Sequence, residues 1–217
     1  MQDLSQPVLV VATRNPGKAR EVRELLSGNG IAVKGLSDFP EFPDPEETGH
    51  SFEENAFLKA QLTARTLGAC VLSDDSGLVV EALDGAPGVY SARFGGPALS
   101  DADRSRLLLK VMEGEKNRRA AFWCCLCLCA PGGEAMTYRG RVEGVIAREA
   151  KGENGFGYDP VFYYPSARKT FAQMTAEEKN AVSHRGQALA LFAADREEVR
   201  ALLARNASGR EKAQPQT

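Results

Sequence analysis

The sequence lacks any apolar run long enough to cross a membrane. Its longest uninterrupted apolar stretch covers residues 120–130, well short of the roughly 20 residues that a transmembrane helix needs. The first residues include an acid, Asp3, and show neither the basic start nor the small-residue cleavage site of a signal peptide. We therefore expect a protein without a membrane partner, located in the cytoplasm.

The sequence also lacks a strong excess of charge. Its 27 basic and 29 acidic residues leave a net charge of −2, whereas nucleic-acid binders usually concentrate basic residues on one face. We therefore expect no nucleic-acid partner, and any binding of a polyanion must be local. The length of 217 residues and 43% hydrophobic content predict one domain over residues 1–205, followed by a polar, frayed tail over 206–217.

Histidine is scarce, and the cysteines are unevenly placed. His50 and His184 are the only two histidines, too few for a histidine metal site. Four of the five cysteines are Cys124, Cys125, Cys127 and Cys129. Alternate cysteines on a strand lie about 6 to 7 Å apart, too far for disulfides, and structural zinc sites prefer paired cysteines on loops. We therefore expect buried, reduced thiols.

Apolar runs and helical periodicities alternate along the chain. Residues 7–12 are typical of a buried strand, and Asn15 before Pro16 favours a helix start. Ser51 with Glu54 predicts a capped second helix, on which Ser51, Asn55 and Lys59 share one face. The buried stripe predicted for this helix consists of Ala56, Phe57, Ala60, Ala64 and Leu67.

The second half of the chain predicts a third helix over residues 102–112 and a hairpin from 119–130 and 134–146. Thr175 with Glu178 predicts the cap of a short helix, and Asp195 with Glu198 the cap of the last one. Strands that alternate with helices, together with one hairpin, indicate an α/β fold around a mixed sheet.

Two neighbouring acids, Asp74 and Asp75, lie between apolar residues 71–72 and an extended pattern over 78–83. On a strand they would point to opposite faces, so one of them would enter a site. Together with Glu47 from the acidic loop at 38–49, such a carboxylate could hold magnesium. The alternative is a simple turn, because Asp, Ser and Gly all favour turns.

The segment at residues 13–18 separates the first strand from the first helix. A helix N-terminus attracts anions, and Lys18 adds a full positive charge in the first turn. The alternative is an ordinary capped helix with a surface lysine, since the segment is not a Walker phosphate loop.

Further along, Phe156 and Tyr158 stand on a glycine-bearing loop where aromatic rings could stack on a base, although a lone Phe is more often part of the core. Lys179, His184 and Arg185 gather three nitrogen donors around a short helix and its end. A role in reading a base or a phosphate is the functional interpretation of these donors.

These segments together resemble the inosine triphosphate pyrophosphatase family, also called XTP/dITP diphosphatases. The resemblance runs in order from about residue 8 to residue 192. Its motifs are residues 13–18, 46–49 with Phe52 and 54–56, 73–78, 85–93, 155–160 and 177–189, the most specific being Phe156-Gly157-Tyr158-Asp159 and Ser183-His184-Arg185-Gly186.

The resemblance implies a role for each matched position. Asp75 would be the catalytic proton acceptor and a magnesium ligand, with Glu47 as second metal ligand and Asp74 in a supporting part. Arg14, at a variable position, receives no role. The residues expected to bind substrate are Thr13, Asn15, Lys18, Lys59 and Ser76 for the triphosphate, Phe156, Gly157, Tyr158 and Asp159 for the purine pocket, and Lys179, His184 and Arg185 for the nucleotide.

The resemblance also implies an elongated mixed sheet flanked by helices, two lobes with a nucleotide cleft between them, and a homodimer. The implied reaction is the magnesium-assisted attack of water on the α-phosphorus of ITP, dITP or XTP, which gives the monophosphate and pyrophosphate and clears deaminated purines from the nucleotide pool. Two alternatives stay open: a Maf-like pyrophosphatase with another base preference, and a module that binds nucleotides without hydrolysing them.

Overall fold

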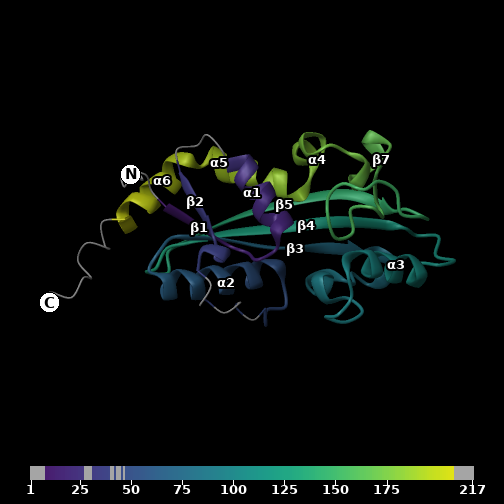
Figure 1. Ribbon diagram of the computed structural model, residues 1–217, viewed down its shortest axis with the longest axis horizontal. Helices are drawn as coiled ribbons and strands as arrows, with labels where there is room; N and C mark the ends of the chain where they lie inside the picture. The colour runs from purple at the N-terminus through teal and green to yellow at the C-terminus, as the bar shows by residue number, and fades with distance from the viewer. Residues whose placement is uncertain (1–7, 27–30, 40–41, 43–44, 46, 208–217) are drawn as a thin grey trace. The chain divides into compact units, whose positions relative to one another are not determined.

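The computed structural model describes residues 8–26, 31–39, 42, 45 and 47–207 (Figure 1). Seven strands form one sheet in the order β2-β1-β3-β4-β5-β6-β7. β1 pairs in parallel with β2 and β3, whereas β6 pairs antiparallel with β5 and β7, which confirms the expected mixed sheet. The strands are β1 (Val8–Ala12), β2 (Ala32–Gly35), β3 (Val71–Val80), β4 (Arg119–Cys129), β5 (Ala135–Ile146), β6 (Phe162–Tyr164) and β7 (Lys169–Thr170).

Helices flank the sheet, and short 3₁₀ turns join several elements. The α-helices are α1 (Pro16–Leu26), α2 (Phe52–Leu67), α3 (Asp101–Val111), α4 (Ala176–Val182), α5 (His184–Ala194) and α6 (Arg196–Ala207). The 3₁₀ turns are Leu36–Asp38, Glu81–Leu83, Gly88–Arg93, Pro165–Ala167 and Phe171–Gln173.

The chain divides into two compact units. Unit 1 contains Met1–Asp75, Cys125–Tyr138 and Ala188–Thr217, and unit 2 contains Ser76–Cys124 and Arg139–Gln187. Strands β3, β4 and β5 each contribute residues to both units. The two units agree with the two lobes expected from the sequence, and the nucleotide cleft stays a prediction.

In unit 1, α2 lies on one side of β1 while α1 and α6 lie on the other (Figure 1). The side chain of Ser51 accepts a hydrogen bond from the backbone N–H of Glu54, which confirms the predicted cap of α2. The predicted buried stripe of α2 is confirmed for its alanines Ala56, Ala60 and Ala64, all fully buried.

The cysteine-rich strand β4 packs in one hydrophobic core with the buried face of α2. Cys125, Cys127 and Cys129 cluster with the alanine stripe of α2. All five cysteines are buried and none forms a disulfide, as expected. Small thiols opposite alanines allow a helix and a sheet to approach closely at interior packing density, which gives these cysteines a structural role that sequence reasoning had not found.

Unit 2 is built around an aromatic core. The ring centroid of Phe122 lies 4.6 Å from that of Phe162 and 5.9 Å from that of Phe171. Helix α3 lies on one side of the strands of this unit and α4 on the other (Figure 1). Thr175 and Glu178 form the predicted capping box of α4.

The predicted boundaries needed two corrections in β3. The strand continues through Asp74, Asp75, Ser76 and Gly77, so the turn interpretation is wrong. It then ends at Val80, and the expected extended run to residue 83 is a 3₁₀ turn over Glu81–Leu83. Pairing of β3 within the sheet overrides the turn preference of these residue types, because local propensity is a weak determinant inside a sheet.

Other predicted elements lie close to the observed ones. The third helix starts and ends one residue earlier than expected, and the hairpin is observed as β4 and β5. Helix α6 follows Asp195 and ends at Ala207; the rest of the expected tail lies outside the described residues. Pro7, at the start of the first predicted strand, also lies outside them.

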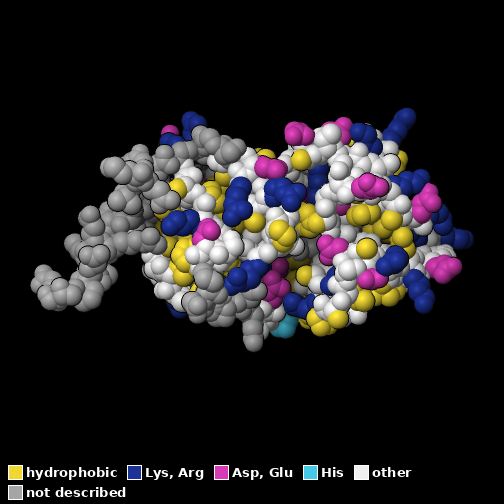
Figure 2. All heavy atoms as spheres, in the orientation of Figure 1, with side chains coloured by type: hydrophobic (Ala, Val, Ile, Leu, Met, Phe, Trp, Pro, Cys, Tyr) yellow, Lys and Arg dark blue, Asp and Glu magenta, His cyan; other side chains and the backbone are white. Residues whose placement is uncertain are grey.

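Within the described residues, every helix is too short or too polar to span a membrane. Acidic and basic side chains are mixed over the face in Figure 2, in keeping with the net charge of −2.

Candidate functional site

The loop from β1 to α1 is held by its own side chains. Thr13 Oγ1 accepts a hydrogen bond from the Asn15 backbone N–H at 3.1 Å. Asn15 Oδ1 in turn accepts from the N–H groups of Gly17 at 2.9 Å and Lys18 at 3.1 Å. Asn15 therefore caps α1, as predicted.

Five charged residues of unit 1 meet beside this loop. Lys18 Nζ lies 2.7 Å from Asp74 Oδ1. Lys59 Nζ lies 2.7 Å from Glu47 Oε1 and 3.6 Å from Asp75 Oδ1, and it donates to the Asp74 carbonyl at 2.9 Å. Three carboxylates thus face two ammonium groups, which leaves the cluster with one negative charge in excess.

Asp75 is a deeply buried member of this cluster. Its side chain is 6% exposed, and within the described residues its Oδ2 atom is buried without a hydrogen-bond partner. Burial raises the pKa of Asp75 and outweighs the opposing attraction of Lys59 and Lys18. For Lys59, burial acts to lower the pKa, but the carboxylates of Asp75 and Glu47 together raise it above its usual value. Lys59 therefore stays charged, while Asp75 is the cluster carboxylate with an open oxygen.

Asn55 completes this group and was not assigned a role from the sequence. It is fully buried, and its Oδ1 accepts from the N–H of Gly49 at 2.7 Å. Its Nδ2 forms no hydrogen bond of good geometry in the described part of the chain, yet it lies close enough to Asp75 to lower the pKa of that carboxyl. The signal in the sequence was the fourfold spacing of Asn55 and Lys59 on one face of α2.

The donor set fits a magnesium ion that carries its own water and phosphate ligands. Among the described residues, no group of three or more His, Cys, Asp and Glu side chains is placed to hold a metal. Magnesium, however, is commonly held by one or two carboxylates with waters and substrate phosphates. Asp75, with its unpartnered oxygen, and Glu47 supply two such carboxylates; Glu46 lies outside the described residues.

In unit 2 the predicted purine loop is fixed by a buried ion pair. Asp159 Oδ2 lies 2.6 Å from Lys179 Nζ, and the two side chains are 3% and 5% exposed. The same oxygen accepts from the Phe156 N–H at 2.8 Å. Gly155 has a φ of 78°, and a Cβ there would lie 2.0 Å from Asp159 Oδ2, so only glycine fits.

Cations lie over the ring of Phe156. The Lys179 ammonium is 4.7 Å from the ring centroid, and the Arg185 guanidinium is 5.7 Å from it. Arg185 also donates to Ser76 Oγ at 2.8 Å. Phe156 is partly exposed, so the structure brings together a ring and three polar side chains that could contact a base or a phosphate.

Tyr158 and His184 lie deeper in unit 2. Tyr158 is buried in the hydrophobic core and donates its hydroxyl to the Ser91 carbonyl at 2.9 Å. The imidazole of His184 stacks on Phe122 with the ring centroids 4.7 Å apart. The backbone of Gly157 is held by Asp101 and Ser105.

Gly186 allows a close approach between α4 and α5 at the segment Ser183-His184-Arg185-Gly186. Ser183 Oγ accepts from the N–H of Gly186 at 3.0 Å. A Cβ at Gly186 would lie 1.8 Å from the carbonyl oxygen of Asn180. The two helices therefore approach too closely for any side chain here, and this approach sets the positions of His184 and Arg185.

The fourteen predicted site residues form one group in each unit. Unit 1 holds Thr13, Asn15, Lys18, Glu47, Lys59 and Asp75, whereas unit 2 holds Ser76, Phe156, Gly157, Tyr158, Asp159, Lys179, His184 and Arg185.

Comparison with known proteins places this geometry in a family. The model of the Ham1 family matches residues 9–195. A dITP/XTP pyrophosphatase of an Exiguobacterium species is 55% identical over 181 residues, which cover 83% of this chain and 92% of the relative. A dITP/XTP pyrophosphatase of Geobacter sulfurreducens is 51% identical over 186 residues, covering 85% of this chain and 94% of the relative.

Solved structures of Ham1 proteins are also similar to this chain. A HAM1 protein from Coxiella burnetii superposes with a TM-score of 0.81 at 42% identity, covering 88% of this chain and 98% of that one. The Staphylococcus aureus Ham1 protein gives a TM-score of 0.79 at 43% identity with the same coverage. With a family model that matches most of its length and relatives above 50% identity, the chain belongs to the Ham1 family.

Proposed function

We propose that the protein is a deaminated-purine nucleoside triphosphate pyrophosphatase, in which Ser76 is one of the residues that bind the triphosphate. It hydrolyses dITP, ITP and XTP to the monophosphate and pyrophosphate, in line with its relatives, which are named dITP/XTP pyrophosphatases. In this proposal Thr13, Asn15, Lys18 and Lys59 bind the triphosphate, and Asp75 and Glu47 hold magnesium.

The observation that carries the proposal is the open oxygen of Asp75. A buried carboxylate oxygen without a partner costs free energy unless a ligand completes it. Bound magnesium would polarise the phosphate and neutralise charge that grows on its oxygens. Asp75 then orients the attacking water and accepts its proton, and the nearby side chain of Asn55 acts to lower the pKa of that carboxyl. Lys18 and Lys59 offset the charge of the departing pyrophosphate.

The base contact follows from donors in unit 2. Hypoxanthine and xanthine carry a keto oxygen at C6 where adenine carries an amino donor. Donors of His184 or Arg185 would bond to the keto oxygen and would face another donor in adenine. An unsatisfied buried donor costs about 1–3 kcal/mol, or roughly 5- to 150-fold in selectivity. The partly exposed ring of Phe156 supports stacking against the base.

The decisive experiment is identification of the products formed from ITP with magnesium. We expect inosine monophosphate and pyrophosphate in equal amounts. Release of orthophosphate would place cleavage at the γ-phosphorus and would contradict the proposal. Absence of any hydrolysis, with binding retained, would favour the nucleotide-sensing module. Comparable kcat/KM values for ITP and a pyrimidine triphosphate would favour a Maf-like specificity.

The role of Asp75 is tested by Asp75→Asn with magnesium saturating. Loss of a general base typically lowers turnover by about 10²- to 10⁴-fold. The matched control is Glu113→Gln, which neutralises an exposed acid on the turn after α3 and should keep full activity. Near-normal turnover of Asp75→Asn would remove this residue from the mechanism.

The proposal also includes a cytoplasmic homodimer, which rests on the family resemblance. Sedimentation equilibrium at micromolar concentration should give twice the mass of the 23.4 kDa chain. A monomer at this concentration would contradict that part of the proposal alone.

A further inference from the structure

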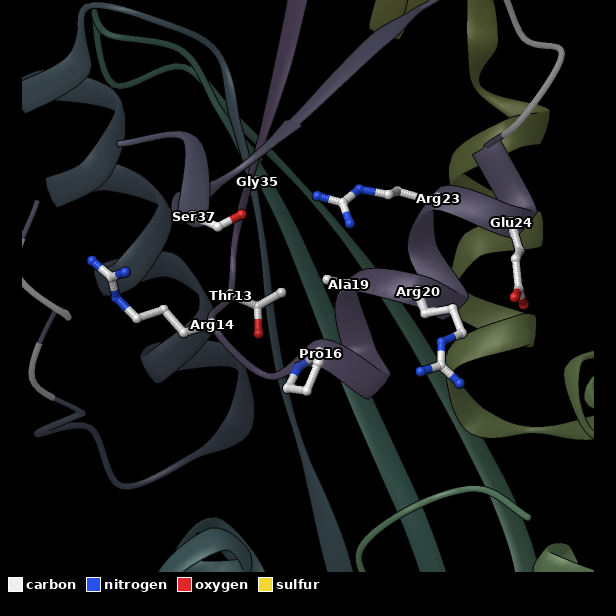
Figure 3. A pocket seen from close by; sticks show the side chains of 9 residues that line it. All are labelled: Thr13, Arg14, Pro16, Ala19, Arg20, Arg23, Glu24, Gly35 and Ser37. Atoms are coloured by element: carbon white, nitrogen blue, oxygen red, sulfur yellow. The ribbon is translucent and has the colours of Figure 1, made fainter. Parts of the chain in front are cut away.

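The described side chains around the hollow at the start of α1 do not converge on one ligand. This hollow of about 510 Å³ is lined in part by Arg20, Arg23, Glu24 and Ser37, which are all exposed. In Figure 3 the guanidinium of Arg20 points away from Arg23 and Ser37. Polar side chains converge instead in unit 2, on the loop that carries Phe156.

Phe156 lies between two glycines whose backbone is left-handed. The φ angle is 78° at Gly155 and 61° at Gly157. Because glycine loses more backbone freedom on folding than any other residue, such a loop keeps one conformation only where other contacts hold it. Asp159 Oδ2 provides one contact, since it accepts from the Phe156 N–H at 2.8 Å. The other side of the ring, at Gly157, is held from α3.

Helix α3 engages both backbone polar groups of Gly157. Asp101 Oδ2 accepts from the Gly157 N–H at 2.8 Å, and the hydroxyl of Ser105 donates to the Gly157 carbonyl oxygen at 3.0 Å. Asp101 is exposed, whereas Ser105 is 3% exposed. The two residues are four positions apart and therefore lie on one face of the helix. An acceptor and a donor at this spacing match the donor and the acceptor of a single residue.

The start of α3 is itself fixed within unit 2. The side chain of Ser100 caps the helix by accepting from the Asp103 N–H. Arg104 is 5% exposed, and its guanidinium donates to three carbonyl oxygens in the segment before the helix, those of Phe94, Gly96 and Leu99. The contacts of Asp101 and Ser105 therefore tie the loop to an anchored element.

We infer that Asp101 and Ser105 are positioning residues for the base, which hold Gly157 so that the ring of Phe156 is in place before the nucleotide binds. The inference rests on the proposed function, because the base is that of the purine substrate. A loop that is already ordered spares the cost of ordering it on binding. Such a contact stabilises bound substrate and transition state equally, so its loss raises KM and leaves kcat unchanged.

Steady-state kinetics of ITP hydrolysis, with magnesium saturating, test the two residues. Asp101→Ala and Ser105→Ala each remove one hydrogen bond to Gly157, and we expect KM to rise about 2- to 10-fold in each with kcat kept. Asp101→Asn retains an oxygen that can accept from the Gly157 N–H and should restore a near-native KM. The matched control is Asp103→Ala, which removes an acid of the same helical turn that pairs with Arg106, and it should keep the native KM.

Inorganic tripolyphosphate, which has no base, shows where the effect lies. As a competitive inhibitor it occupies only the contacts to the triphosphate. Its inhibition constant should therefore be the same for the native chain, Asp101→Ala and Ser105→Ala. An inhibition constant that rises in parallel with the KM for ITP would overturn the inference, because the variants would then disturb the whole site.

Two measurements without turnover separate this inference from the proposed reaction. In the nucleotide-free protein, NMR should show faster amide hydrogen exchange at Gly157 in Asp101→Ala than in the native chain or in Asp101→Asn. Calorimetry should show that inosine monophosphate binds more weakly to both alanine variants by the factor found for KM. These results would support the inference even if ITP were cleaved at another phosphorus. Unchanged affinity and unchanged KM in both variants would overturn it even if ITP yields pyrophosphate.

Discussion

Replacement of Asp159 by asparagine should destabilise the protein strongly. Asp159 and Lys179 form an ion pair at 2.6 Å, with side chains only 3% and 5% exposed. In Asp159→Asn the ammonium of Lys179 stays buried without its carboxylate. Removing one partner of a buried pair costs about 3–5 kcal/mol in free energy of unfolding. At about 2–4 °C per kcal/mol for a chain of this size, the Tm should fall by roughly 6–20 °C.

The double variant Asp159→Asn/Lys179→Met identifies the cause. It removes both charges, and neutral replacements of a buried pair are often close to the original stability. We therefore expect it to be more stable than Asp159→Asn in urea unfolding, although it has two changes. Glu134→Gln is the control, because its pair with Arg205 is 60% and 58% exposed and such pairs contribute about 0–1 kcal/mol.

Two results would refute this reasoning. A loss of less than about 1 kcal/mol in Asp159→Asn would mean that the pair behaves like a surface pair. A double variant no more stable than Asp159→Asn would mean that an uncompensated ammonium is not the cause. Because Asp159 also holds the Phe156 N–H, the KM for ITP in the folded fraction should rise in Asp159→Asn.

Three further predictions follow from packing and burial. Gly186→Ala should lower the free energy of unfolding by about 1–3 kcal/mol or more, since its Cβ would meet the Asn180 carbonyl at 1.8 Å; a thermal melt unchanged from that of the native chain would contradict this close approach. The five buried cysteines should resist Ellman's reagent at about pH 8 until the chain unfolds. Burial raises the pKa of Cys127 to about 12, so at this pH roughly one Cys127 side chain in 10⁴ is a thiolate. Rapid labelling of the folded protein would contradict this prediction, because it would show an accessible thiolate. Without metal, Asp75→Asn should be more stable than the native chain near neutral pH. This advantage should shrink as the pH falls through the raised pKa of Asp75, because the native carboxyl then binds its proton; an advantage independent of pH would exclude that cause.

Local sequence signals predicted the parts of the fold that depend on local chemistry. The caps at Ser51 and Thr175 were read correctly, because a side-chain oxygen three residues before an unpaired amide is a short-range interaction. The alanine stripe of α2 was also correct, since periodicity records which face is buried.

The errors arose where distant segments decide the outcome. Asp74 to Gly77 has the composition of a turn, yet pairing within the sheet makes it the middle of a ten-residue strand. The cysteines were explained only by the alanines that face them, which come from a helix about 60 residues earlier in the chain. Neither relation is encoded in a local window of sequence.

In the candidate site, too, local signals were readable from the sequence, whereas contacts between distant segments were not. Spacing identified Asn15, Lys18 and Asp75 as candidates, but their significance came from the resemblance to a family. Only the structure revealed the partners: Lys18 is bound to Asp74, and Lys59 joins Glu47 to Asp75. Asn55 was overlooked because a buried amide that contacts a carboxylate has the same sequence pattern as a polar helix face.

These partners bear on how substrate binds. Both lysines of the charged cluster, Lys18 and Lys59, are already paired, and the cluster carries one excess negative charge. A triphosphate alone would therefore meet carboxylates as well as ammonium groups. A divalent cation on Asp75 and Glu47 would turn that excess into a positive one. Under the proposed function, metal and nucleotide therefore bind more tightly together than either does alone, and by linkage each raises the affinity for the other by the same factor. The cluster thus favours the metal–nucleotide complex over the free nucleotide through charge alone, before any contact with the base.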